Sequence, residues 1–446
     1  MAGALAAAWL ALAGVAIAVW PRVAADRARR GWVLALALAF SLVLQLAVAT
    51  VPDHAFVTFR YARNVAEGHG AVYTIGERVE GVPDFLWLVL VSMPKALFGV
   101  DVVPGAVALG VVCTLGCVVL AHLLGKRFAG GAAVIAAVLT AGASILAAHG
   151  QAGTETALFT LLALAVVLAL ATGHPLVAGV LAALAVMTRS DGIVLALLGE
   201  LWLLSTAVRR RSNWWAPAGY LLGALVFLVP WWAWEATYYG RADWSVSPHR
   251  PYGFLVCALL AVGVAAVCGR LGARRTRPSP RRRRAPVERR AVPVVALVLC
   301  AVSVPVALAV QGIVDRDRGR LAQTTEIGHW LRDHLPAGSV LDTSGNAALA
   351  YRAGSRMTIT GITDPAATTE YAPVAHLGLP DLAAPRAWYY PSQRCERTAG
   401  YATGYEVATF RRDDTSWLTL YLRGDAEARL LGRLAGDHRL TYVPCG

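Results

Sequence analysis

Two neighbouring side chains that follow an apolar run could take part in acid–base chemistry. Asp53 comes directly after Pro52, where a long apolar run ends, and His54 is next. A carboxylate and a neutral imidazole can each accept a proton from a hydroxyl group, so either residue could act as a general base. The segment that they begin, residues 52–102, is dense in ionisable side chains. They include Arg60, Arg63, Glu67, His69, Glu77, Arg78, Glu80 and Asp84.

The first arginines of this segment fall on a predicted helix, Ala55–Glu67. Phe56, Phe59 and Arg60 share one face of it through their i, i+3 and i+4 spacing, and Arg63 continues that face. Guanidinium groups placed in this way can bind a phosphate or a carboxylate of a substrate. The alternative is that they lie at a membrane surface and extend their charged ends toward water.

A second set of charges interrupts apolar runs further along the chain. Glu155 begins one run, and Arg189 and Asp191 break another. A charge at the centre of a membrane span costs about 2.5–3.5 kcal/mol, so such residues are candidates for a functional site. Structural explanations are equally open: an acid at a helix N-terminus for Glu155, and an ion pair within a turn for Arg189 and Asp191.

The surrounding chain has the composition of an integral membrane protein. Apolar residues make up 57% of its 446 residues and charged residues 15%, against about 25% charged in soluble proteins. This excludes a disordered chain, a collagen and a small disulfide scaffold. The net charge of +13 comes almost entirely from arginines in short loops without interleaved aromatic residues, so we expect a lipid bilayer and no nucleic acid as partner.

Runs of about 20 apolar residues are long enough to cross a bilayer. The sequence predicts about ten crossings and therefore a mainly α, polytopic membrane protein. The predicted spans are Gly3–Trp20, Gly31–Val51, Val103–Leu124, Phe128–Ala148, Glu155–Ala171, two shorter spans between Pro175 and Ala207, Trp214–Thr237, Gly253–Cys268 and Pro293–Gln311.

Basic loops determine the expected orientation, because they stay on the cytoplasmic side. We expect the first span to be retained, with the N-terminus outside, since its arginines follow the apolar stretch. Phe85–Gly99 has only fifteen residues and contains Pro94 and Lys95. If it crossed the membrane, the later basic loops would lie outside. We therefore expect it to lie on, or dip into, the outer face. The Arg-rich loop 270–291 then forms a disordered cytoplasmic linker, and residues 52–102 are extracytoplasmic.

Residues 313–446 have the pattern of a small extracytoplasmic α/β domain, whereas residues 1–312 form the transmembrane module. The pattern predicts a helix Leu321–His334 and strands Ser339–Asp342 and Met357–Ile362, with a short helix between the strands. Cys395 and Cys445 are the only cysteines of this part. Outside the cytoplasm they could form a disulfide, and two free thiols are the alternative.

Several motifs together resemble one family of membrane enzymes. Residues 53–64 (DHAFVTFRYARN), Glu67-Gly68-His69-Gly70 and residues 76–81 (GERVEG) resemble the first external loop of GT-C glycosyltransferases. The similarity is greatest to the arabinofuranosyltransferases that cap the cell-wall arabinan of mycobacteria and corynebacteria. Weaker matches keep their order over most of the chain. They are Phe85-Leu86-Trp87, Gly153-Thr154-Glu155-Thr156, Thr188-Arg189-Ser190-Asp191-Gly192, Tyr238-Tyr239-Gly240 and Gly361-Ile362-Thr363-Asp364-Pro365.

The resemblance implies an enzyme of the cell membrane whose active site faces outward. It would transfer a sugar, such as arabinofuranose, from a polyprenyl-phosphate donor to a cell-envelope glycan of an actinobacterium, with inversion and with Asp53 as general base. His54 is the competitor for that role. The candidate substrate-binding residues are Arg60, Arg63, Glu77, Glu80, Glu155, Arg189, Asp191 and Tyr239. Tyr239 and its neighbour Tyr238 could equally belong to an aromatic belt at the membrane surface.

The chain also departs from the family pattern. The family has two aspartates where this chain has Asp53-His54, and a later Gly-Gly-Asp motif is missing. No cofactor is therefore assigned, and a divalent metal is the open alternative. The alternative function is a non-catalytic relative that serves as a scaffold in envelope assembly. A transporter lacks support, because the sequence shows no inverted repeat.

Overall fold

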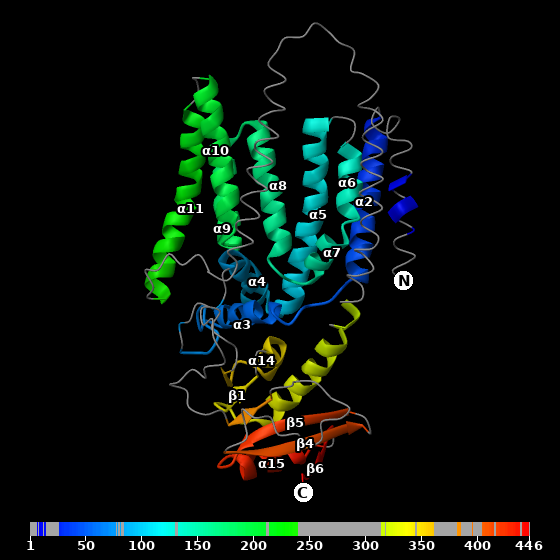
Figure 1. Ribbon diagram of the computed structural model, residues 1–446, viewed down its shortest axis with the longest axis vertical. Coiled ribbons are helices and arrows are strands. Elements are labelled where there is room, and N and C mark those ends of the chain that lie inside the picture. The colour runs from blue at the N-terminus through cyan, green and yellow to red at the C-terminus, as the bar shows by residue number, and fades with distance from the viewer. Residues whose placement is uncertain are drawn as a thin grey trace. The chain divides into compact units, whose positions relative to one another are not determined.

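A computed structural model gives the structure of the chain (Figure 1). It describes residues 26–129 except 77, 79, 80, 82 and 83, then 133–210, 214–239, 314–360 except 317, 344 and 345, 381–384, 395, 404–437 except 414 and 415, and 439–445, with residues 7, 9–11, 13 and 14 near the N-terminus. The chain divides into two compact units. Unit 1 comprises Met1–Thr50, Pro83–Trp87 and Pro104–Val314, and unit 2 comprises Val51–Val82, Leu88–Val103 and Asp315–Gly446.

Unit 1 is built from apolar helices that run side by side (Figure 1). They are α2 (Arg27–Ala47), most of α5 (Val102–Ala129), α6 (Ala133–Ala141), α7 (Ser144–Gln151), α8 (Thr156–Thr172), α9 (Pro175–Thr188), α10 (Gly192–Arg210) and α11 (Trp215–Tyr239). Helix α9 packs against α8, α10 and α11, while α2 packs against α6 and α7. Gly179 on α9 permits the closest of these approaches, because a Cβ there would overlap the backbone carbonyl of Tyr220 on α11.

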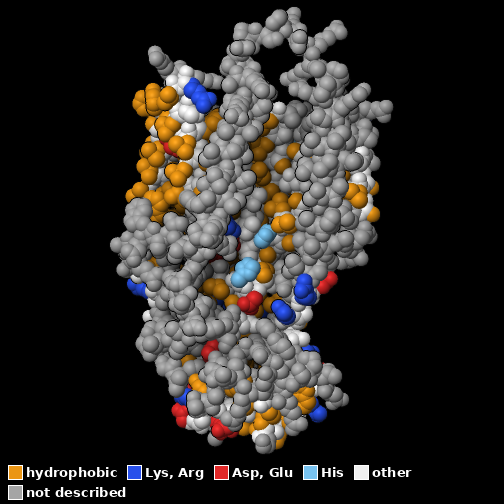
Figure 2. All heavy atoms as spheres, viewed as in Figure 1, with side chains coloured by type: hydrophobic (Ala, Val, Ile, Leu, Met, Phe, Trp, Pro, Cys, Tyr) orange, Lys and Arg blue, Asp and Glu red, His pale blue; other side chains and the backbone are white. Residues whose placement is uncertain are grey.

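Among the described residues, four helices are long and apolar enough to cross a membrane: α2, α5, α10 and α11. The pair α6 and α7, bent by 57°, makes a fifth if it counts as one span. Large apolar side chains such as Leu201, Leu222 and Phe227 are exposed on α10 and α11, and Figure 2 shows hydrophobic side chains over this part of unit 1. Such a surface is stable against lipid and unfavourable in water, so the chain is a mainly helical membrane protein.

The ten predicted crossings correspond to the described helices only in part. Helices α8 and α9 have 17 and 14 residues and are shorter than a straight span needs. The predicted spans Gly253–Cys268 and Pro293–Gln311, the loop 270–291 and most of Gly3–Trp20 lie outside the described residues. Helix α4 (Phe85–Phe98) forms where a short apolar segment was predicted, and its 14 residues are also too few to cross a membrane straight.

Unit 2 contains a six-stranded sheet with the strand order β2-β1-β3-β5-β4-β6. The strands are β1 (Val340–Asp342), β2 (Thr358–Thr360), β3 (Leu382–Ala383), β4 (Tyr405–Asp413), β5 (Ser416–Arg423) and β6 (Thr441–Val443). Strand β1 runs parallel to both β2 and β3, whereas the pairs β3–β5, β5–β4 and β4–β6 are antiparallel. Helix α15 (Glu427–Ala435) buries Leu430 and Leu434, which are spaced i, i+4, against this sheet. The α/β pattern predicted for this part is therefore present.

The first loop belongs to the same unit as this sheet. Helix α3 (Ala55–Ala66) forms as its spacing predicts and buries Phe56, Phe59 and Arg60 on one face. Helix α14 (Ala347–Ala353) connects β1 to β2 and packs against α3. The rings of Phe56 and Phe59 lie 5.5 and 6.4 Å from that of Tyr351 on α14. The sequence predicts that the first loop belongs to the transmembrane module. In the structure, residues 51–82 and 88–103 instead form one compact unit with the C-terminal part.

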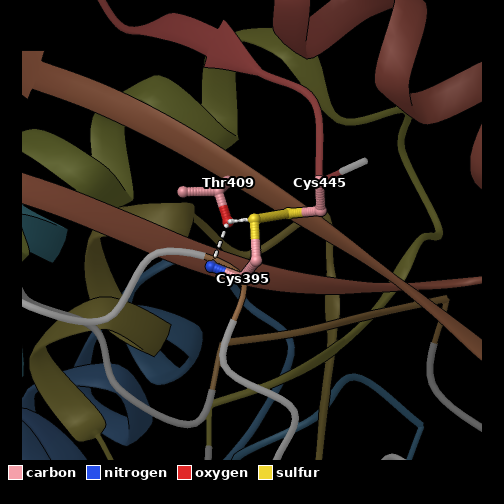
Figure 3. The surroundings of a disulfide bond; sticks show 3 residues. All are labelled: Cys395, Thr409 and Cys445. Carbon is pink, nitrogen blue, oxygen red and sulfur yellow. Dashed lines mark hydrogen bonds between the residues drawn. A yellow bond between two sulfur atoms is a disulfide. The ribbon is translucent and has the colours of Figure 1, made fainter.

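Cys395 and Cys445 are joined by a disulfide, with their Cα atoms 5.6 Å apart (Figure 3). The bond lies beside the buried Thr409 of β4, whose hydroxyl accepts a hydrogen bond from the backbone N–H of Cys395 at 3.2 Å. It ties Cys445, the second residue after β6, to a residue fifty positions earlier in the chain.

Candidate functional site

The Asp53 carboxylate is held in a fixed orientation by the backbone of α14. Its Oδ2 accepts the N–H of Ala347 at 3.0 Å and its Oδ1 accepts the N–H of Ala348 at 2.8 Å. The helix begins here because the Asn346 side chain accepts the N–H of Leu349 at 2.9 Å. Asp53 is nevertheless exposed, and each carboxylate oxygen keeps a second lone pair. The residue can therefore still accept a proton from a ligand.

His54 stands at the start of α3 and is also exposed. Its side chain makes no capping hydrogen bond to that helix. The structure therefore places both candidate bases at the surface of unit 2, and the backbone contacts to α14 restrain Asp53.

Arg60 is a structural residue in this fold. Its side chain is 1% exposed. The guanidinium donates to four backbone carbonyls: Tyr73 at 2.9 Å, Ala350 at 2.6 Å, Gly354 at 3.1 Å and Met357 at 3.0 Å. Burial lowers the pKa of Arg60 from its usual value. A substrate-binding role for Arg60 does not fit this geometry, because its donors are occupied and the side chain is covered.

Arg63, which is partly exposed, contacts the same helix α14. Its Nη1 donates to the carbonyl of Tyr351 at 2.8 Å, and its guanidinium carbon lies 3.4 Å from the centroid of the Tyr351 ring. The neighbouring Arg352 places its own guanidinium carbon 5.5 Å from that centroid. The Tyr351 hydroxyl donates to Asp101 at 2.8 Å. No local pattern in the sequence marks Tyr351, Arg352 or Asp101, because only folding brings these distant segments together.

Glu155, Arg189 and Asp191 form one ion cluster in unit 1. Arg189 makes a two-pronged contact with Asp191, with Nε–Oδ1 and Nη2–Oδ2 distances of 3.0 Å, and its Nη1 donates to Glu155 Oε1 at 3.0 Å. The hydrogen bond with Asp191 is the main cause that raises the pKa of Arg189. The cluster brings together three predicted site residues, but its net charge is −1. A phosphate would have to compete with two carboxylates for this guanidinium.

The remaining predicted site residues contribute less. Glu77 and Glu80 lie outside the described residues. Tyr239 ends α11 and belongs to an aromatic cluster of unit 1, where its ring lies 4.9 Å from that of Tyr238 and 6.2 Å from that of Trp234. Trp234 in turn packs against Phe85 at 4.9 Å. These contacts fit both an aromatic belt and a surface for sugar stacking.

No group of three or more His, Cys, Asp or Glu side chains with the geometry of a metal site occurs among the described residues. The Asp53-His54 pair, where the family pattern has two aspartates, does not form one.

Comparisons with protein-family models, with curated proteins and with solved structures find no match to this chain.

Proposed function

We propose that the protein is a ten-span GT-C-like membrane glycosyltransferase that transfers a sugar from a polyprenyl-phosphate donor to a cell-envelope glycan. The observation that carries the proposal is the exposed Asp53 carboxylate, whose orientation two backbone N–H groups fix. A general base acts best when it is held in place and remains reachable by its substrate.

In the proposed reaction, Asp53 accepts the proton of an acceptor hydroxyl. The acceptor oxygen attacks the anomeric carbon from the face opposite the phosphate, so a single displacement inverts its configuration. The polyprenyl phosphate leaves with the bonding electron pair and needs cations rather than an acid. Arg60 is buried, so it does not supply such a cation. Arabinofuranose is the sugar that the sequence resemblance suggests.

A direct assay tests the proposal on the purified chain in lipid nanodiscs. Wild-type protein should release polyprenyl phosphate from the sugar donor in the presence of a glycan acceptor. Asp53→Asn should lower turnover about a hundredfold to ten-thousandfold, while His54→Ala should retain most of it. Turnover that survives Asp53→Asn and is lost in His54→Ala would assign the base to His54.

The second candidate is a scaffold protein of envelope assembly. This function is favoured because two arginines that were predicted to bind ligand instead make contacts within the protein. Arg60 donates hydrogen bonds to four backbone carbonyls, and Arg189 is paired with Glu155 and Asp191. If Asp53→Asn fully restores the envelope of a strain that lacks the gene, and the wild-type chain neither binds nor turns over a donor, the scaffold function is correct.

The proposed sidedness has its own test. In a chain whose unpaired cysteines are replaced by alanine, Arg356→Cys should react with an impermeant maleimide on intact cells, and Pro280→Cys should react only after lysis. The reverse result would place the C-terminal part in the cytoplasm.

A further inference from the structure

Two guanidinium groups of unit 2 flank one tyrosine and have no acidic partner. Arg63 and Arg352 place their guanidinium carbons 3.4 and 5.5 Å from the centroid of the Tyr351 ring. Both side chains are partly exposed. In the part of the chain that the structure describes, neither forms an ion pair with a carboxylate.

The charge around these two arginines is not balanced. Arg60 is buried against the carbonyls of Ala350 and Gly354, on either side of Tyr351 and Arg352. The carboxylates hydrogen-bonded to this part of α14 are those of Asp53 and Asp101. Three guanidinium groups therefore face two carboxylates. A bound anion would offset the remaining charge. The partly exposed guanidinium groups that could bind it are those of Arg63 and Arg352, of which Arg352 has a buried Nε.

The same tyrosine lies at the boundary of a membrane span. Its hydroxyl donates to Asp101 Oδ1, which also accepts the N–H of Val102 at 2.9 Å. Val102 is the first residue of α5, one of the helices able to cross a membrane. Just before it, Leu97 and Phe98 are 70% and 78% exposed. Large exposed apolar side chains favour the interfacial region of a bilayer, so Leu97 and Phe98 give unit 2 an apolar surface suited to lipid, close in sequence to Asp101.

We propose that Arg63 and Arg352 bind the phosphate group of an anionic phospholipid of the bilayer. Guanidinium groups match phosphate oxygens through paired N–H donors, and Leu97 and Phe98 would contact the acyl chains of the same lipid layer. This site is distinct from the proposed transfer reaction. It assigns Arg63 to a bilayer lipid rather than to the sugar donor.

Hydrogen exchange of the full chain in nanodiscs tests the assignment. The probe is phosphatidylglycerol, and discs of pure phosphatidylcholine are the reference. In the wild type, phosphatidylglycerol should slow exchange of the amides of residues 346–357 by about fivefold for each engaged arginine. Arg352→Gln should remove most of this protection. Arg63→Lys, which keeps the charge but loses the paired donors, should weaken it.

Arg356→Gln is the matched control, because it removes the same charge from an exposed position four residues from Arg352. It should retain the protection. Equal loss in Arg352→Gln and Arg356→Gln would show diffuse surface attraction and overturn the site. The site would also be overturned if only polyprenyl phosphate, added to phosphatidylcholine discs, slowed the exchange. The site would then bind the sugar donor rather than a bilayer lipid. Full protection by inorganic phosphate would likewise reject a bilayer lipid. None of these readouts requires sugar transfer.

Discussion

The carboxylate of Asp53 and the backbone N–H of Ala348 lie 2.8 Å apart, although 295 positions separate the two residues in the chain. The contact joins the residue proposed as general base to the first turn of α14. The stability of unit 2 and the proposed role of Asp53 as general base therefore depend on the same side chain, and the variants below are chosen to separate these two effects.

Asp53→Ala removes both hydrogen bonds to the α14 backbone. Because two N–H groups lose their acceptor, we expect unit 2 to lose about 1 kcal/mol of stability, the typical cost of a lost helix cap. Exchange of the Ala347 and Ala348 amides should become faster. Asp53→Asn keeps an acceptor oxygen and should lose less. Equal exchange in wild type and Asp53→Ala would contradict the contact.

Arg60→Met should destabilise the chain more than any other substitution in the first loop. It leaves four carbonyls without their donor, and each unsatisfied buried group costs about 1–3 kcal/mol. We expect the thermal midpoint in detergent to fall strongly, or the protein to fail to accumulate. Arg60→Lys should not rescue it, because one ammonium group cannot reach four carbonyls arranged around a planar fork. Arg356→Gln, at an exposed position, should leave the midpoint unchanged.

The ion cluster of unit 1 should respond more strongly to loss of its cation than to loss of one anion. Arg189→Gln leaves Glu155 and Asp191 close together without compensation, whereas Glu155→Gln leaves the Arg189–Asp191 pair intact. We therefore expect a larger drop in thermal midpoint for Arg189→Gln. A larger drop in thermal midpoint for Glu155→Gln than for Arg189→Gln would contradict this expectation.

Acid should weaken unit 2 partly through Asp437. Hydrogen bonds from the Arg439 side chain and backbone lower the pKa of Asp437, and His334 Nε2 lies 3.2 Å from its Oδ2. Since the folded pKa lies below the unfolded value of about 3.9, this contribution is complete above that pH and is lost as the pH falls through the folded pKa. Asp437→Asn should lower the thermal midpoint by about 2–4 °C at pH 7 and much less near pH 3.

The Cys395–Cys445 disulfide should be detectable in protein isolated without reductant. Mass spectrometry should recover the two cysteines in one cross-linked peptide pair, whereas the buried Cys113 and Cys117 should be recovered as thiols. Replacing both Cys395 and Cys445 by serine should lower the stability of unit 2 by about 2–4 kcal/mol. Complete alkylation of both cysteines without reduction would show that the bond is absent.

The sequence by itself determined the features that depend on local spacing. The apolar runs identify the chain as a membrane protein, and the i, i+3, i+4 pattern predicts α3 with Phe56, Phe59 and Arg60 on one face. The order strand, short helix, strand near residues 340–360 is also predicted from the sequence, because apolar residues recur with different periods in strands and helices. These features need no information about distant parts of the chain.

Only the tertiary structure decided what the charged side chains contact. A charged residue at the end of an apolar run has the same sequence signature whether it binds a ligand, caps a helix or pairs with another charge. The Asp53 carboxylate accepts hydrogen bonds from the backbone of α14, Arg60 donates to four backbone carbonyls, and Arg189 donates to two carboxylates. Arg352 lies near Arg63 only because α3 and α14, which are nearly three hundred positions apart in the chain, pack against each other. Burial and long-range hydrogen bonds determine these roles, and both depend on the path of the whole chain.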